Sequence, residues 1–80
     1  MVYKTKGVCS QLINVEVENN IVTSVEFVGG CNGNTQGVAA LVEGMDVHEA
    51  IRRLEGIHCG PRPTSCPDQL SKALTQAIGE

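Results

Sequence analysis

Two stretches of alternating apolar and polar residues, on either side of an Asn-Asn pair, constrain the fold of this chain most. Alternation with a period of two is typical of strands with one buried face, and Asn tolerates the positive φ angles of a tight turn. Residues 11–18 and 21–28 are therefore predicted to form a β-hairpin around Asn19 and Asn20. Residues 2–8 are expected to add a third strand. The residues expected on the apolar face of the hairpin are Ile13, Val15, Val17, Ile21, Thr23, Val25 and Phe27.

Two short helices are predicted to follow the hairpin. The apolar residues at helical spacing in the first are Val38, Leu41 and Val42. The second is expected to begin at Asp46, because Glu49 three residues later completes a pattern that resembles a capping box. Its apolar residues are Ile51 and Leu54. Glycines suit the C-terminal ends of helices, and these two helices are followed by Gly44 and Gly56.

A third helix is predicted to begin near Pro67, since proline is well tolerated in a first turn. Its apolar stripe is expected to consist of Leu70, Ala73, Leu74, Ala77 and Ile78. The order of elements predicts an α+β fold, a small antiparallel β-meander of two to three strands covered on one face by about three helices. We expect residues 1–80 to form a single domain.

Composition places the chain near the size at which a hydrophobic core alone is barely sufficient. It has 80 residues, one Phe and one Tyr, so a metal, disulfides or a second subunit is expected to add stability, and a short edge strand suits a homo-oligomer. The net charge of −3 and the scattered basic residues argue against nucleic-acid binding. No stretch suits a membrane span, and residues 1–8 lack the apolar core of a signal peptide. We therefore expect a cytoplasmic protein with reduced thiols.

The four cysteines follow the spacing C-x21-C-x27-C-x6-C, which by itself is a weak zinc signal because it contains no C-x-x-C pair. Residues opposite each other on paired strands share a face, and matching the apolar faces of the hairpin leaves two registers. One places Cys9 opposite Cys31, and the other offsets them by two residues. Cys66 falls on the buried stripe of the third helix, and a six-residue loop joins it to Cys59. All four thiols are thus expected to converge under the helices.

Three uses of these thiols are open. Cysteine often serves as a small buried hydrophobe, and cysteines pair as disulfides in oxidising compartments. The favoured hypothesis is a metal site, because tetrahedral Zn²⁺ accepts four thiolates at ~2.3 Å and metal binding would stabilise an aromatic-poor core. The predicted zinc ligands are Cys9, Cys31, Cys59 and Cys66. An iron–sulfur cluster is the alternative occupant.

Other candidate residues give weaker signals. Cys31 precedes a helix, a setting that lowers the pKa of a thiol, but a nucleophile would need a base such as a histidine. His48 is expected to be a solvated residue in the first turn of the second helix, while His58 could replace a thiolate ligand. The glycine-rich residues 29–34 favour a tight turn over an anion site. Arg62 is expected to be exposed.

The run from Thr64 to Asp68 reads T-S-C-P-D and resembles the signature of the TSCPD-domain family. The glycines around Cys31 and the pair Cys59-Gly60 also resemble small, stand-alone, four-cysteine members of that family, so the likeness covers nearly the whole chain. It implies a metal-binding or accessory module in which the family's cysteines are Cys9, Cys31, Cys59 and Cys66.

Related TSCPD domains occur near the C-terminus of adenosylcobalamin-dependent ribonucleotide reductases, so the resemblance implies a role in nucleotide metabolism, with a ribonucleotide reductase as the expected partner. An 80-residue chain is too small for the ten-stranded catalytic barrel of such an enzyme, and we do not expect a complete reductase. The passage from Phe27 through Gly30 and Cys31 into a helix also resembles iron–sulfur scaffold proteins. A sulfur-handling protein, including a thiol enzyme that uses Cys31 or Cys66, is therefore the alternative function.

Overall fold

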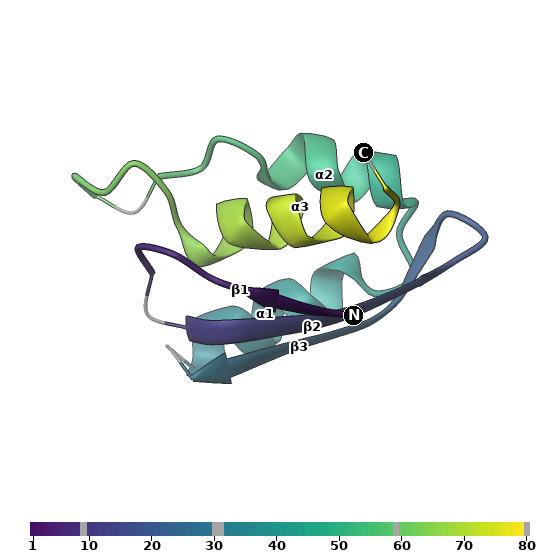
Figure 1. Cartoon of the computed structure of the whole chain (residues 1–80), viewed down its shortest axis with the longest axis horizontal. Coiled ribbons are helices and arrows are strands. Elements are labelled where there is room, and N and C mark those ends of the chain that lie inside the picture. Colours follow the sequence, from purple (N-terminus) through teal and green to yellow (C-terminus); the bar gives the residue numbers. More distant parts are fainter. Residues whose placement is uncertain (9, 30–31, 59, 80) are drawn as a thin grey trace.

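The structure is a computed structural model that describes residues 1–8, 10–29, 32–58 and 60–79. The elements are, in chain order, β1 (Val2–Lys4), β2 (Ser10–Glu18), β3 (Ile21–Gly29), α1 (Asn32–Val42), α2 (Val47–Leu54) and α3 (Cys66–Ala77). Within the described residues, three antiparallel strands in one sheet and three helices make an α+β fold, as predicted (Figure 1).

The predicted hairpin is confirmed. The strands lie in the order β1-β2-β3, and Asn19 and Asn20 form the turn between β2 and β3 with φ angles of 53° and 65°. Ile13 pairs with Phe27 along the middle of the hairpin. This is the register that, continued without interruption, sets residue 9 opposite residue 31. The ladder is irregular just after Ser10, however, and the predicted meeting of the two cysteines lies outside the described residues.

A β-bulge corrects the predicted apolar face of β3. Glu16 pairs with Ser24, but the next residue of β2 pairs with Val22, so Thr23 is the extra residue of the bulge. Its hydroxyl donates a hydrogen bond to the Glu16 carbonyl at 3.1 Å. A bulge reverses the alternation of side chains beyond it. Val22 is therefore fully buried, whereas Ile21 and Thr23, which were predicted on the apolar face, are exposed.

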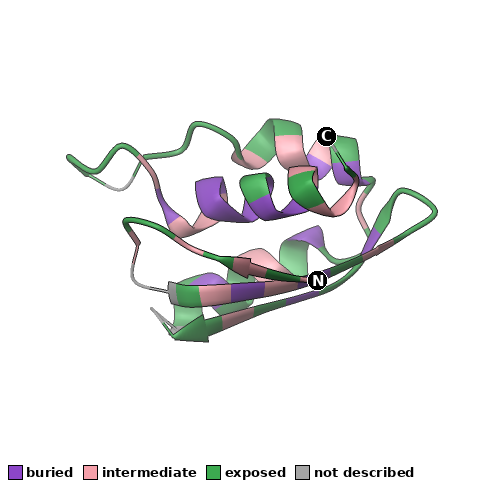
Figure 2. Cartoon of the chain, viewed as in Figure 1, coloured by how far each residue is buried: buried purple, intermediate pink, exposed green. Residues whose placement is uncertain are grey.

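Helices α1 and α3 pack on the same face of the sheet, α1 against β3 and α3 against β2, and α2 packs on α3. Figure 2 shows buried residues along α3 and along the strands beneath it. The buried core consists of Ile13, Val15, Val22, Val25, Val42, Val47, Ala50, Leu70, Ala73 and Leu74. These described core residues are all aliphatic. The two aromatic residues, Tyr3 and Phe27, are partly buried and pack against the cluster.

The predicted faces of the helices are largely confirmed. Leu70 and Leu74 on α3 are fully buried, and Asp46 caps α2 by accepting a hydrogen bond from the Glu49 backbone N–H at 3.0 Å. Leu41 was predicted on the inner face of α1 and is instead 77% exposed. Neighbouring residues of a helix point about 100° apart, and Val42 is the one that faces the core.

The residues between α1 and α2 cover the first half of the outer edge of β3. The Val22 N–H donates to the Met45 carbonyl at 2.9 Å, and the Gly44 N–H donates to the Val22 carbonyl at 2.7 Å. Further along the strand, the Glu43 carboxylate accepts a hydrogen bond from the Val25 N–H at 3.0 Å. Backbone groups that would otherwise be open to another strand are therefore occupied.

Candidate functional site

The T-S-C-P-D run forms the beginning of α3. Ser65 is the N-cap, and its hydroxyl accepts a hydrogen bond from the Asp68 backbone N–H at 3.1 Å. The same hydroxyl donates to the carbonyl of Ile57 at 2.7 Å. Cys66 is the first helical residue, and Pro67 follows where a missing N–H costs little. The cap thus joins the helix to the loop that precedes Cys59.

Asp68 strengthens this connection to the preceding loop. Its carboxylate is buried and accepts hydrogen bonds from the Gly56 N–H at 2.7 Å and from the Thr64 hydroxyl at 2.5 Å. The Lys72 ammonium lies 3.9 Å away. Burial alone would raise the pKa of Asp68, but the hydrogen bonds from Thr64 and Gly56, with the charges of Lys72 and His58, outweigh it and lower this pKa.

Gln69 joins α3 to the N-terminal loop. Its side-chain carbonyl accepts a hydrogen bond from the Lys6 backbone N–H at 3.1 Å, and its amide donates to the Thr64 hydroxyl at 3.0 Å. Gly7 packs directly on Thr64, since a β-carbon at Gly7 would lie 3.4 Å from the Thr64 methyl group. The four side chains that make these contacts, which we call the clamp, are Thr64, Ser65, Asp68 and Gln69.

The described residues that flank the cysteine positions 9, 31, 59 and 66 lie towards the same end of the molecule (Figure 1). The loop around Cys9 is closed by a hydrogen bond from the Thr5 N–H to the Gln11 carbonyl at 3.2 Å. Ser10 pairs with Gly29 across the sheet. The residue two positions before each cysteine is described, and each makes a contact. Gly7 packs on Thr64, and Gly29 pairs with Ser10. Ile57 accepts a hydrogen bond from Ser65, and Thr64 accepts one from Gln69.

The predicted site residues have different outcomes. Cys66 is half-buried rather than fully buried at the start of α3. Cys9, Cys31 and Cys59 lie outside the described residues, so their predicted role as ligands stays a prediction. Within the described ranges, no three His, Cys, Asp or Glu side chains gather closely enough to hold a metal ion. His48, predicted to be solvated, has 56% of its side chain exposed.

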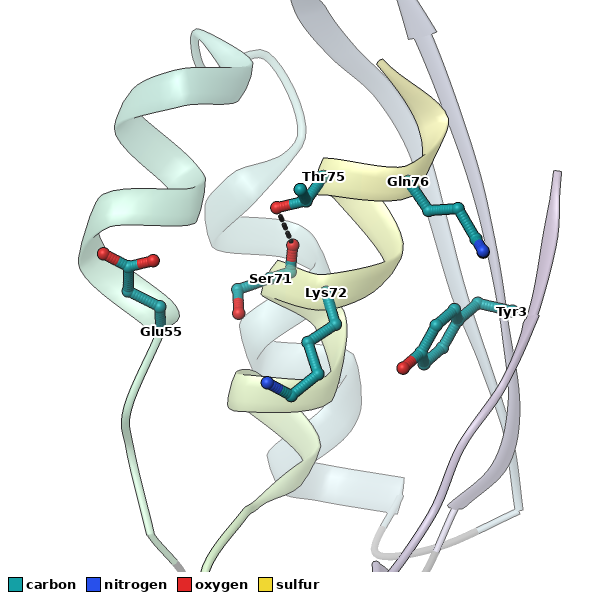
Figure 3. A pocket seen from close by; sticks show the side chains of 6 residues that line it. All are labelled: Tyr3, Glu55, Ser71, Lys72, Thr75 and Gln76. Carbon is teal, nitrogen blue, oxygen red and sulfur yellow. Dashed lines mark hydrogen bonds between the residues drawn. The ribbon is translucent and has the colours of Figure 1, made fainter. Parts of the chain in front are cut away.

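A pocket of about 360 Å³ lies beside α3, and no clamp residue lines it (Figure 3). It is lined by Tyr3, Glu55, Ser71, Lys72, Thr75 and Gln76. Its walls are polar, and the Thr75 hydroxyl is engaged with the Ser71 carbonyl at 2.8 Å. Cys66, the cysteine that the structure describes, is not among the lining residues, so the pocket offers no thiol chemistry from the described part of the chain.

The clamp was not predicted from the sequence, although part of it has a local signal. Ser65 followed three residues later by Asp68 matches the spacing of an N-cap and an acidic first-turn residue. The contact between Gln69 and Lys6 has no such signal, because a side-chain hydrogen bond between residues 63 apart depends on the tertiary fold.

Fold and clamp together define a small α+β domain that is organised around the N-terminus of its last helix. The TSCPD domain family matches residues 1–78 of the 80-residue chain, and the chain therefore belongs to this family. The resemblance seen in residues 64–68 is thus confirmed. No curated protein and no solved structure is found to match the chain. Of the helices in the described ranges, none has the length and apolarity that crossing a membrane requires.

Proposed function

We propose that this domain is a metal-binding module in which Cys9, Cys31, Cys59 and Cys66 hold one Zn²⁺ ion. The observation that supports this best is that described residues two positions before each cysteine, namely Gly7, Gly29, Ile57 and Thr64, lie towards the same end of the fold. Ser65 and Thr64 contact Ile57 and the N-terminal loop, and that loop continues into the strand that pairs with Gly29. Each cysteine is only two residues from one of these contacts.

The charges around these segments suit thiolate ligands. The segments 5–10, 29–32 and 56–66 contain Lys6, His58 and Arg62 but no Asp or Glu in the sequence. The Asp68 carboxylate contacts the third segment, but it accepts hydrogen bonds from Gly56 and Thr64 and has the Lys72 ammonium 3.9 Å away. Four thiolates and one Zn²⁺ carry a net charge of −2, and positively charged neighbours favour the thiolate over the thiol. The donor set and its surroundings therefore fit a closed zinc site, which would supply structural stability rather than catalysis.

The direct test is elemental analysis of protein purified without air. We expect about one zinc per chain in the wild type and a clear loss of zinc in Cys66→Ser. Thr75→Ser, a conservative change on the same helix, should keep the metal content of the wild type. A wild-type protein that contains no metal, and takes up none when zinc is added, would rule the site out.

An iron–sulfur cluster on the same cysteines is the second candidate. The observation that favours it is the passage from a strand that ends at Gly29 to a helix that begins at Asn32, with Cys31 between them, as the resemblance to iron–sulfur scaffold proteins suggested. The elemental analysis separates the two candidates. Iron with inorganic sulfide and visible absorbance would identify a cluster, whereas zinc alone would identify the closed metal site.

The role of the module is proposed to be accessory, with a larger protein as its partner. The occurrence of related domains in adenosylcobalamin-dependent ribonucleotide reductases makes a reductase the partner to test first. Titration of the metal-loaded domain into such a purified reductase, followed by calorimetry, would measure the association. Absence of binding at micromolar concentrations would remove the reductase from consideration without affecting the metal site.

A further inference from the structure

We infer that the clamp holds three of the four cysteine-bearing segments, those of Cys9, Cys59 and Cys66, together in the metal-free protein, so that its members are positioning residues for the metal site. The part of this inference that concerns metal affinity rests on the proposed function. The part that concerns the metal-free protein does not, because it follows from hydrogen bonds among described side chains and backbone groups.

The clamp has the chemistry of a structure that forms without metal. Ser65, Asp68 and Gln69 are each 5% exposed or less. Buried polar groups that lack a hydrogen bond destabilise a fold, and every buried side-chain nitrogen and oxygen in the described ranges has a partner. The clamp therefore stabilises the meeting of the loops through its own bonds, before any ligand contributes.

Two of its bonds fix different segments. The bond from the Lys6 N–H to Gln69, at 3.1 Å, holds the segment that leads to Cys9. The bond from the Gly56 N–H to Asp68, at 2.7 Å, holds the segment that leads to Cys59. Both acceptors lie on the first turn and a half of α3, the helix that begins with Cys66. Through these bonds, α3 holds the segments that lead to Cys9 and Cys59 at set positions relative to its own first residue, Cys66.

The clamp residues would act as side chains do that hold the ligands of a metal in position without binding the metal themselves. Side chains that orient the ligands of a metal, without binding it, typically change metal affinity by about 10–100-fold when they are replaced. The cause is that a ligand held in place loses less conformational freedom on binding than a ligand on a loose loop. Removal of one clamp bond is expected to weaken metal binding while all four thiols remain.

The first experiment follows amide hydrogen exchange in the metal-free protein. In the wild type, the Lys6 and Gly56 amides should exchange slowly, because both donate to buried acceptors. In Gln69→Met, which keeps a long side chain but removes both hydrogen bonds, Lys6 should lose protection while Gly56 keeps it. Fast exchange of both amides in a wild-type protein whose Leu74 amide remains protected would overturn the inference.

The second experiment measures zinc affinity by competition with a coloured chelator. Gln69→Met should bind zinc about 10–100-fold more weakly than the wild type, whereas Gln76→Met, an exposed change on the same helix, should leave the affinity unchanged. Should Gln69→Met fold poorly, Asp68→Leu removes a different clamp bond, the one from the Gly56 N–H, and should also weaken zinc binding. Asp68→Asn keeps an acceptor for Gly56 and should bind zinc nearly as tightly as the wild type.

The two readouts separate the inference from the function on which it partly rests. A wild type that binds no zinc would end the proposed function, and the exchange of the Lys6 and Gly56 amides would then decide the inference alone. A wild type that binds zinc together with a Gln69→Met variant of equal affinity would overturn the positioning role and leave the metal site intact.

Discussion

At the scale of single residues, two neighbours on α3 occupy opposite environments. Leu74 is fully buried in the core, whereas Lys72 keeps 53% of its side chain exposed, with its ammonium 3.9 Å from Asp68. Two steps along a helix turn a side chain by about 200°, so the pair samples the inner and outer faces of one element. Their different surroundings predict different costs of truncation.

We predict that Leu74→Ala lowers the free energy of unfolding by about 2–5 kcal/mol, because it removes buried apolar groups and leaves a cavity. Lys72→Ala should change it by no more than about 0.5 kcal/mol, since the Lys72 ammonium is exposed and the Asp68 carboxylate keeps its hydrogen bonds from Gly56 and Thr64. Urea titration of both variants measures the difference. Similar losses at the two positions would mean that the buried face of α3 is assigned wrongly.

At the scale of elements, α2 depends on charge as well as on packing. The Glu49 carboxylate accepts hydrogen bonds from Arg52 at 2.6 Å and from Arg53 at 2.5 Å, one turn further along the helix. The bond from Arg52 and then the bond from Arg53 lower the pKa of Glu49 to about 2. These groups are exposed, so solvent screens their contribution to stability.

The sign of the resulting pH dependence is fixed. The pKa of Glu49 in the folded protein lies below the value of about 4.3 for an unfolded chain. Its stabilising contribution is therefore complete above about pH 4.3 and is lost as the pH falls towards about 2. We predict that Glu49→Gln is less stable than the wild type at pH 7 and that this difference shrinks below pH 4. Urea unfolding midpoints of the wild type and Glu49→Gln, measured at pH 7 and at a pH below 4, test this prediction. A difference between the two proteins that is larger in acid would contradict it.

The elements themselves could largely be predicted from periodicity, and the errors have identifiable physical causes. At Ile21, Val22 and Thr23, each side chain is compatible with a strand interior, so alternation alone could not reveal the bulge that turns Val22 inward. In α1, the apolar neighbours Leu41 and Val42 compete for one inner position, and only the tertiary packing selects Val42. The contact of Gln69 with Lys6 could not be predicted from the sequence, because it joins residues that are 63 apart.

At the scale of the whole molecule, a small aliphatic core makes a further source of stability, such as a second subunit or a bound metal, important. The largest fully buried side chains in the described part of the chain are those of Ile, Leu and Val. The outer edge of β3 is half covered, by Glu43 and by the residues that follow it, and β1 has three residues. These edges offer little length for pairing with the strand of a second copy. A homo-oligomer stays a prediction. We favour a bound metal as the additional source of stability.

We therefore predict that metal removal lowers the melting temperature markedly. A ligand present at 100 to 1,000 times its Kd adds about 2.7–4.1 kcal/mol, which for a domain of this size corresponds to about 10–30 °C. Melting curves recorded with and without a strong chelator measure this. The difference should disappear in Cys66→Ser, and it should shrink in acid because protons compete for the thiolates. Identical wild-type curves with and without chelator would show that these cysteines only pack.

The long reach of the clamp has a consequence for the newborn chain. Lys6 and Gln69 are 63 residues apart, and ribosomes add about 5–20 residues per second, so about 3–13 s of translation separate the two partners. During that interval the Lys6 backbone has been made, but the helix whose Gln69 accepts its hydrogen bond has not. The contact between Lys6 and Gln69 must therefore form after α3 has been translated. A chain that terminates before Gln69 would leave the ribosome without this hydrogen bond.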